Sequence, residues 1–304
     1  MLAPTRLLLD TDIGTDVDDC LALALILRSP EIQLEGVTCV YGDVPLRARM
    51  VLKMLRLAGR EDIPVCMGCR KPLLGIRPVY WAGHEGRGML EPGDESLAPS
   101  QEHAADFIIR TVMANPGEIH LLAIGPLTNV ALACLREPRL VENLAGLTVM
   151  AGAIRGRGAF DLPYAEHNVR SDPEAAHIVF TSGARVRMVP LDVTMRVAVR
   201  RDGVERIRQG GTPLHELVAR QVELYPHFAE HGFTYLHDPL AAASIVRPEL
   251  LAFEALHIDV ELAGSHAVGA TLARQGADDL INADVALAVD APAFESFLVE
   301  RLSS

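Results

Sequence analysis

The sequence predicts an α/β protein, a single domain with a mostly parallel, Rossmann-like central sheet flanked by helices. Two observations lead to this fold class. Short apolar runs alternate with helical patterns along the 304 residues, and this alternation is typical of a parallel sheet covered by helices on both faces. No repeat, low-complexity tract or polar linker interrupts the chain. We therefore expect one domain that spans residues 1–304.

Strands are expected where a short apolar run ends in turn residues or acids. They cover residues 6–9, 34–40, 119–124, 147–150, 186–189, 256–262, 267–273 and 285–289. Helices are expected where the apolar residues follow a helical period. They cover residues 18–28, 45–58, 101–114, 127–136, 173–181, 213–224 and 239–245, followed by a last helix. Asp172 before Pro173 and Asp238 before Pro239 are typical helix starts, because Asp caps the helix and Pro fits its first turn.

Two connections are too long to be simple turns. Residues 70–99 are rich in Gly and Pro and carry Trp81, His84 and Glu85, and residues 151–163 are rich in Gly and Arg. Loops of this length are often binding loops or lids. Ligands of open α/β sheets bind beyond the carboxyl ends of the strands. We therefore expect the functional site at that edge, with His84 as a candidate contact.

The charge balance excludes two classes of partner. With 28 basic and 40 acidic residues, the formal charge is −12, whereas nucleic acid polymers and anionic membrane surfaces attract basic proteins. No apolar run is long enough to span a membrane, and the first residues do not have the pattern of a secretory signal. We expect a cytoplasmic protein that binds neither nucleic acid polymers nor membranes.

The five cysteines are odd in number and mostly lie in apolar surroundings. This pattern indicates reduced core thiols in a reducing compartment. Cys66 and Cys69 have the spacing of a redox motif, which is the alternative interpretation. They do not stand at an obvious helix start, so the sequence favours a structural role.

Five of the ten residues from Asp10 to Asp19 are aspartates. Asp10 and Asp12 end an apolar strand, and Asp18 and Asp19 open the next helix. Close carboxylates repel one another unless a cation or a shared proton compensates, and oxygen donors alone suit Ca²⁺ or Mg²⁺. A helix start accounts for one acid but not for five. The cluster therefore indicates a metal site.

Three later segments are expected to converge on the same sheet edge. The strand before Ile124 ends in a Gly-Pro turn, where a backbone carbonyl is freed. Glu166 and Asn168 come just before a helix start, and His237 stands in front of Asp238 at another. Each segment alone has a structural explanation as a turn or an N-cap. Together with the aspartates they indicate a site that combines carboxylates, an amide and a histidine.

These motifs together resemble the Ca²⁺-dependent nucleoside hydrolases of the inosine/uridine-preferring type, over nearly the whole chain. The matching segments are the aspartate cluster, residues 37–44, 124–129, 150–152, 165–168, 172–176 and 237–241. The resemblance implies a single α/β domain of nucleoside hydrolase type, assembled as a homodimer or homotetramer. It also implies hydrolysis of the N-glycosidic bond of a small-molecule ribonucleoside to free base and ribose.

The resemblance implies a role for each matching residue. The Ca²⁺ ligands would be three carboxylates and one main-chain carbonyl, those of Asp12, Asp19, Asp238 and Ile124. Asp12 would also take the proton from the attacking water, and His237 would protonate the departing base. The ribose hydroxyls would be held by Asp18, Glu166 and Asn168, with Asp10 supporting the cluster.

This assignment agrees with the chemistry of the reaction. Cleavage of an N-glycosidic bond builds positive charge on the ribose ring, which neighbouring carboxylates stabilise. A cation balances those carboxylates and orients the water. The base leaves poorly as an anion, and a histidine has a suitable pKa to protonate it.

The remaining substrate contacts carry the departures from the family pattern. Asp43 stands where the family more often has Asn, and Phe160 takes the place of an Asn that contacts the ribose 5′-hydroxyl. His167 replaces a usual Phe, and the stretch around His84 matches the family loosely, whereas Met150 keeps its motif. These changes concern the 5′ side and the base, so an altered or modified nucleoside is an alternative substrate.

Two other functions are weighed against hydrolysis of nucleosides. Asp10 and Asp12 at a strand end also resemble the nucleophile motif of Mg²⁺ phosphatases of the haloacid dehalogenase type. That chemistry needs a lysine later in the chain, and the two lysines, Lys53 and Lys71, are both early. A non-catalytic ribose- or Ca²⁺-binding protein on the same scaffold is the third interpretation. The presence of Asp12 and His237 argues against it.

Overall fold

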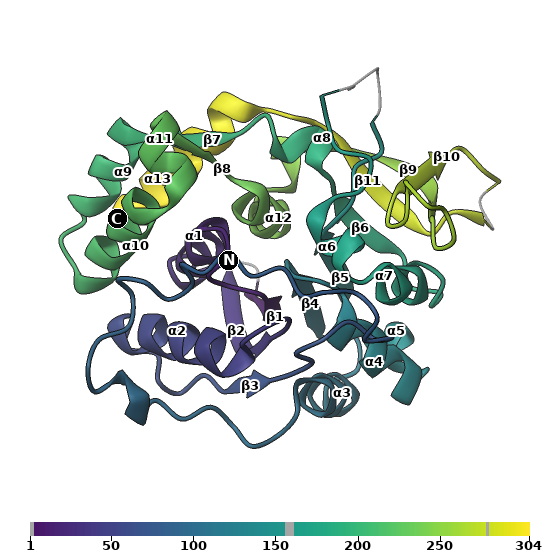
Figure 1. Ribbon diagram of the computed structural model, residues 1–304, viewed down its shortest axis with the longest axis horizontal. Helices are drawn as coiled ribbons and strands as arrows, with labels where there is room; N and C mark the ends of the chain where they lie inside the picture. Colours follow the sequence, from purple (N-terminus) through teal and green to yellow (C-terminus); the bar gives the residue numbers. More distant parts are fainter. Residues whose placement is uncertain (1–2, 156–160, 278–279) are drawn as a thin grey trace.

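A computed structural model describes residues 3–155, 161–277 and 280–304. Its main sheet has nine strands in these ranges (Figure 1). They are β1 (Thr5–Thr11), β2 (Ile32–Cys39), β3 (Val65–Met67), β4 (Ile119–Ala123), β5 (Gly146–Met150), β6 (Val186–Val189), β9 (Leu251–Val260), β10 (Thr271–Arg274) and β11 (Ala283–Val289). The order across the sheet is β10-β9-β11-β6-β5-β4-β1-β2-β3.

Neighbouring strands are parallel from β11 to β3. The pairs of β9 with β11 and with β10 are antiparallel and form one edge. The mostly parallel α/β fold predicted from the sequence is thereby confirmed. The three-residue strand β3 was not predicted, because so short a run does not show the alternation of polar and apolar residues that is typical of a strand.

Helices cover both faces of the sheet (Figure 1). The longer ones are α1 (Asp18–Leu27), α2 (Val44–Leu57), α3 (Ala104–Ala114), α4 (Thr128–Arg136), α7 (Pro173–Phe180), α9 (Arg201–Arg208), α10 (Pro213–Leu224), α12 (His237–Val246) and α13 (Ala291–Ser303). Strand β1 separates two apolar cores, because Leu7 and Leu9 face the first and Leu8 the second. The first core includes α1, α2, α10 and α12, and the second includes α3, α4 and α7.

Several short elements were not predicted. They are α5 (Leu140–Asn143), α6 (His167–Ser171), α8 (Leu191–Thr194), α11 (Pro226–His231), the 3-10 turns at Asp94–Ser96 and Pro248–Leu250, and the strands β7 (Ala198–Arg200) and β8 (Phe233–Tyr235). The two strands pair with each other in a small antiparallel sheet. Helix α9 was also missed, because five of its eight residues are charged.

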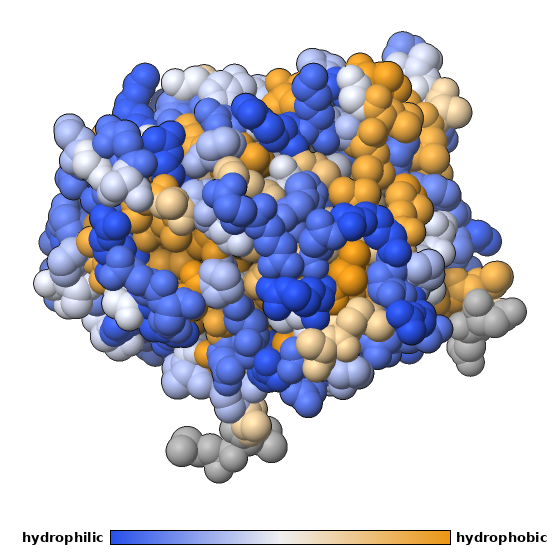
Figure 2. Space-filling model, turned by 90° about the horizontal axis from the view of Figure 1, so that it is seen from below, coloured by the Kyte–Doolittle hydropathy of each residue, from blue (hydrophilic) through white to orange (hydrophobic). Residues whose placement is uncertain are grey.

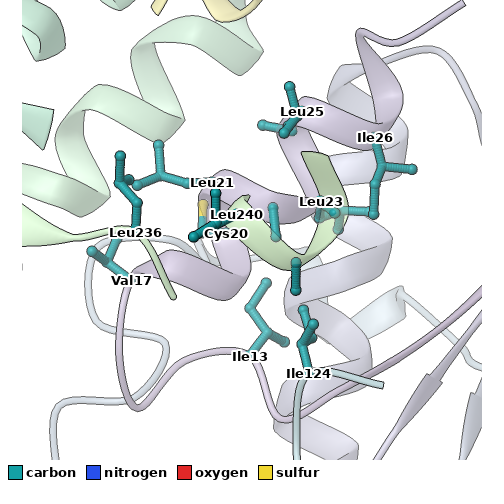
Figure 3. Close-up of a cluster of buried hydrophobic side chains, with 14 of the residues drawn as sticks. Ile13, Val17, Cys20, Leu21, Leu23, Leu25, Ile26, Ile124, Leu236 and Leu240 are labelled. Carbon is teal, nitrogen blue, oxygen red and sulfur yellow. The ribbon is translucent and has the colours of Figure 1, made fainter. Parts of the chain in front are cut away.

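Helices α1 and α12 pack against each other in the first core. Nine consecutive residues of α1, from Asp18 to Ile26, are buried, as are seven of α12, from Asp238 to Ser244. Figure 3 shows Leu240 of α12 among Cys20, Leu21 and Leu23 of α1. Because two buried helices lie together, their acidic first turns are held at one place.

The carboxyl ends of β1, β4 and β5 lie at the same edge of the sheet, since these strands are parallel neighbours. Asp12 follows β1, Ile124 follows β4, and Met150 ends β5. Gly14, in the turn after β1, has a φ of 120°, a conformation that suits glycine. This turn leads the chain from the sheet edge to the start of α1.

One face of the molecule is mostly hydrophilic, with hydrophobic residues gathered in smaller patches (Figure 2). In the described ranges, every helix is too short or too polar to cross a lipid bilayer. All five cysteines are free thiols. Burial raises the pKa of Cys66 and that of Cys69, the latter to about 11, so their surroundings favour the structural interpretation over a redox motif.

Candidate active site

A cavity of about 480 Å³ lies at the carboxyl edge of the sheet. It is bordered by the first turns of α1 and α12, by α6 and by the ends of β4 and β5. The lining includes nine of the residues predicted from the sequence: Asp12, Asp18, Asp19, Ile124, Met150, Glu166, Asn168, His237 and Asp238. Segments more than 200 positions apart in the chain therefore meet in one site.

Three buried carboxylates form the most compact acidic group of the described chain. Each of Asp18, Asp19 and Asp238 offers an oxygen that lies within 4.8 Å of the oxygens of the other two. The backbone N–H of Asp238 donates to Oδ2 of Asp18 at 3.3 Å, which joins the two helix starts directly. This set contains Asp18 in place of the predicted ligand Asp12. The two acids at the start of α1 therefore lie together beside Asp238.

Burial and mutual repulsion disfavour the charged forms of these acids. Burial raises the pKa of Asp18 to about 8, and repulsion by Asp16 adds to the effect. The pKa values of Asp19 and Asp238 lie well above the usual range for the same two reasons. A cation among the three oxygens would reverse these shifts, since a positive charge favours ionised carboxylates. The helix N-termini of α1 and α12 act in the same direction.

Asp12 lies beside a buried arginine. Its pKa is raised by burial, and the charge of Arg47 opposes the rise. Nη2 of Arg47 lies 4.0 Å from Oδ2 of Asp12. The same guanidinium donates to the carbonyl oxygens of Tyr41 and Ile13, each at 2.7 Å. Arg47 therefore connects the segment after β1 with the segment after β2.

Asp10 lies beneath the cavity and outside its lining. Its Oδ1 accepts hydrogen bonds from Thr38 and from Nδ2 of Asn129, the latter at 2.8 Å. Its Oδ2 is buried without a partner, and burial raises the pKa of Asp10 to about 7. Asn129 also accepts from the backbone N–H of Cys69 at 2.8 Å. Asp10 therefore connects β1 with β2 and α4, which agrees with a supporting position.

Glu166 and Asn168 organise the start of α6. The Glu166 carboxylate accepts from the backbone N–H groups of Asn168, Val169 and Gly152, at 2.6, 3.1 and 2.9 Å. Nδ2 of Asn168 donates to the carbonyl oxygens of Ile124 and Met150, at 2.9 and 3.0 Å. These bonds hold both side chains against the ends of β4 and β5.

His237 begins α12 at the cavity wall. Its Nδ1 lies 2.8 Å from Oγ1 of Thr194, and its ring lies 5.6 Å from that of Tyr235. Burial lowers the pKa of His237 to about 4, against an opposing effect of Asp16. The imidazole is therefore neutral near pH 7. It faces the same space as the three carboxylates.

The other predicted substrate contacts lie elsewhere. Asp43 caps α2, where it accepts from the N–H of Leu46 at 3.2 Å, and it does not line the cavity. His84 lines a smaller neighbouring cavity, and its Nε2 lies 2.7 Å from the carbonyl oxygen of Thr15. Phe160 lies outside the described residues.

Neither lysine lines the cavity. Nζ of Lys53 pairs with Asp94 at 2.9 Å and with Glu91 at 3.1 Å, and Lys71 is exposed. The lysine that a haloacid dehalogenase type of phosphatase needs is therefore missing from this wall. The arrangement favours the hydrolase interpretation of the acid cluster.

Sequence reasoning did not identify several residues of the site. Arg47 and Asn129 support it, and Tyr80 and Arg170 line the cavity. The partners of Arg47 and Asn129 lie far away in the sequence, so no local spacing marks these two residues. His167, which the sequence marked only as a departure from the family pattern, also lines the cavity. Tyr225, which lines the smaller neighbouring cavity, donates from its hydroxyl to Oδ1 of Asp16 at 2.8 Å.

The residues present fit a hard divalent cation. The donors are carboxylates, they are buried, and they lie within the span of one ion. Ile124 lines the same cavity, and its carbonyl oxygen accepts a hydrogen bond from Asn168, which leaves a second lone pair. The acidic cluster could therefore bind a metal ion.

Comparison with known proteins agrees with this geometry. The pyrimidine-specific ribonucleoside hydrolase RihA of Citrobacter koseri is 35% identical over 307 residues, which cover 97% of this chain and 97% of that protein. The solved structure of a plant nucleoside hydrolase, PpNRh1, has a TM-score of 0.88 at 31% identity and covers 99% of both chains. That of a purine-preferring ribonucleoside hydrolase from Gardnerella vaginalis has a TM-score of 0.87 at 30% identity and covers 98% of both. Residues 7–296 match the family described as inosine-uridine preferring nucleoside hydrolase, so the chain belongs to this family of hydrolases of N-glycosyl bonds.

Proposed function

We propose that this chain hydrolyses ribonucleosides with a Ca²⁺ ion in the acidic cluster. The observation that carries the proposal is the group of three buried carboxylates within 4.8 Å of one another in the cavity that His237 also lines. Asp19, Asp238, Asp12 and the Ile124 carbonyl would hold the ion. When bound, it would supply positive charge that attracts ribose hydroxyls and favours deprotonation of a water.

Asp12 is the proposed general base. Its carboxylate lines the cavity, and Arg47, 4.0 Å away, favours the ionised form that accepts a proton. The water oxygen would then attack C1′ as the bond to the base breaks. The cluster of carboxylates stabilises the positive charge that develops on the ribose ring.

His237 is the proposed acid for the departing base. Because the ring is neutral near pH 7, the proposal requires the tautomer in which Nδ1 accepts from the Thr194 hydroxyl and Nε2 carries the proton toward the substrate. Asp18, Glu166 and Asn168 are the proposed contacts to the ribose hydroxyls, and all three line the cavity. The carboxylates of Asp18 and Glu166 are acceptors, which suits hydroxyl donors.

The remaining features are proposed from the sequence. We assign residues 1–304 to one hydrolase unit and expect a homodimer or homotetramer. The five free thiols agree with a reducing compartment such as the cytoplasm.

The experiment that tests the proposal is release of free ribose from a panel of purine and pyrimidine ribonucleosides, with Ca²⁺ present. We expect turnover of at least one of them. Asp12→Asn should reduce kcat/KM by about 10²- to 10⁴-fold, the usual contribution of a general base.

Asp62→Asn is the matched control, because Asp62 is an exposed loop carboxylate paired with Arg60. It should leave turnover unchanged. Full activity of Asp12→Asn would show that the base is another residue. Absence of ribose release from every nucleoside, with Ca²⁺ bound and the protein folded, would contradict the proposal as a whole.

A further inference from the structure

A second cavity of about 580 Å³ adjoins the first. The two share Tyr80, His167 and Arg170 in their linings. The other residues around the second cavity are Tyr41, Arg77, Pro78, Val79, Trp81, Ser171 and Val268. The proposed reaction on a plain nucleoside involves residues of the first cavity, so the second is open to a further group of the substrate.

With Glu166 and Asn168 as the proposed ribose contacts, the second cavity adjoins the ribose end of the first. Its wall includes α6, the helix that Glu166 caps and that carries Asn168, whereas His237 lines only the first cavity. His237 marks the end at which the base leaves. A group that extends from the ribose past α6 would therefore enter the second cavity.

The charged groups that line the second cavity are basic. Arg170 is exposed, and its guanidinium makes no ion pair or side-chain hydrogen bond with the described residues. Nη2 of Arg77 pairs with Oε1 of Glu174 at 2.5 Å, but its Nε is buried without a hydrogen-bond partner. His167 adds a third nitrogen-bearing side chain, with its ring 5.8 Å from that of Tyr80.

Three nearby acids have partners of their own. Glu174 pairs through Oε1 with Arg77, although its Oε2 is buried without a hydrogen-bond partner. Glu166 accepts hydrogen bonds from three backbone N–H groups. Asp172 accepts from the N–H of Leu73 at 2.8 Å and from the hydroxyl of Thr128 at 2.7 Å. None of these described acids pairs with the guanidinium of Arg170, in a protein whose formal charge is −12. A guanidinium in this situation suits an oxyanion such as phosphate.

We propose that the substrate is a ribonucleoside that carries a phosphate on its 5′ carbon, with the phosphate bound by Arg170 and Arg77 in the second cavity. This inference deepens the proposed function and rests on it. Water adds its oxygen to C1′, the bond from C1′ to the base nitrogen breaks, and that nitrogen receives the electron pair and a proton. The products are the free base and ribose 5-phosphate, and the phosphate ester stays intact.

The first experiment compares kcat/KM for uridine with that for uridine 5′-monophosphate, and for inosine with inosine 5′-monophosphate. We expect hydrolysis of both phosphorylated substrates, with a preference for the phosphorylated member of at least one pair. Arg170→Gln should shift the ratio of phosphorylated to plain substrate by at least tenfold toward the plain one, and Arg170→Lys should restore part of it.

Arg206→Gln is the matched control, because Arg206 is an exposed arginine on α9, away from both cavities. It should leave the ratio unchanged. Hydrolysis of the plain nucleosides without any hydrolysis of the monophosphates would overturn the inference and leave the proposed function in place. An equal loss for both substrates in Arg170→Gln would also overturn it.

Binding by calorimetry keeps the inference testable if no substrate turns over. Ribose 5-phosphate should bind at least tenfold more tightly than ribose, and Arg170→Gln should abolish that difference. Equal binding of the two would overturn the inference. Binding of inorganic phosphate as tight as that of ribose 5-phosphate would show an independent anion site and would also overturn the proposed substrate.

Discussion

Arg47 has no exposed surface, yet its guanidinium contacts two separate loops beside Asp12. We predict that Arg47→Met lowers the free energy of unfolding by about 3 kcal/mol, because it leaves the buried carboxylate and two buried carbonyl groups without their partner. Urea unfolding at pH 7 measures the change. The matched control is Arg49→Met on the same helix, for which a change below about 0.5 kcal/mol is expected. Equal stability of Arg47→Met and the parent would show that the buried pair contributes nothing net.

Among single residues, the sequence predicts those site residues that are close together in the chain. The aspartates of residues 10–19 are adjacent in the chain, and their density alone indicates a site. Arg47 and Asn129 act on that cluster from 34 and 119 positions away, so no local pattern shows their role. The position of Asp43 also depends on distant structure, because its sequence context does not distinguish a helix cap from a substrate contact.

The packing of α12 on α1 gives a prediction at the scale of elements. Leu240 has no exposed surface and lies against α1 (Figure 3). Leu240→Ala should lower the free energy of unfolding by about 2–5 kcal/mol, because the surrounding core cannot close the cavity that it leaves. Urea unfolding of this variant and of Leu262→Ala, at an exposed leucine, gives the comparison. A similar cost for both would contradict the account of α1 and α12 as a closely packed pair.

Strands β4 and β5 hold a histidine that makes stability depend on pH. Nε2 of His120 lies 2.8 Å from Oγ1 of Thr148, and the ring covers Gly146 on the neighbouring strand. Burial lowers the pKa of His120 from 6.5 to about 4. Between these two values the unfolded chain binds more protons than the folded chain. The stabilisation is therefore complete above about pH 6.5 and is lost as the pH falls toward 4.

The measurement is urea unfolding of the parent and of His120→Gln at pH 7 and pH 5. The parent should lose about 2 kcal/mol more than the variant over this interval. His266→Gln, at an exposed loop histidine, should lose as much as the parent. A constant difference between the parent and His120→Gln would mean that His120 titrates alike in both states.

Long periodic elements were predictable, and short ones were not. The patterns of α1, α2, α3 and α10 extend over ten or more residues, which is enough to define a period. Helix α6 has five residues. It depends on hydrogen bonds that its first backbone N–H groups donate to the Glu166 carboxylate. Such a turn is stabilised by one side chain and its tertiary position. Residues of α6 line both cavities, so the sequence could not predict that the two cavities adjoin.

For the whole molecule, the cation is predicted to contribute to stability. Ca²⁺ at about 100 times its Kd should add about 2.7 kcal/mol, which raises Tm by about 5 °C for a chain of this size. Thermal unfolding with Ca²⁺, with Mg²⁺ and with a chelator measures this. Asp238→Asn should lose the Ca²⁺-dependent increase, whereas Asp62→Asn should keep it. An increase of the same size in Asp238→Asn would place the ion elsewhere.

The overall architecture was readable because parallel strands and their crossover helices repeat along the chain. The antiparallel edge could not be predicted, because the sequences of β9 and β10 do not show in which direction each strand runs in the sheet. The second cavity likewise depends on the fold as a whole. It joins the loop of Arg77 to α6 and to Val268, which three separate regions of the chain provide.

The pairing of α1 with α12 also constrains how the protein is made. Helix α1 is completed within the first 27 residues, whereas α12 begins at His237. During synthesis from the N-terminus, more than 200 residues must therefore follow before α1 receives the part of its cover that α12 provides. Such a nascent chain exposes apolar surface of α1 for most of its translation. Exposed apolar surface favours aggregation and binding by chaperones. The carboxylates of α1 gain their partner Asp238 in the same late step, so a truncated chain has neither a closed core nor a complete site.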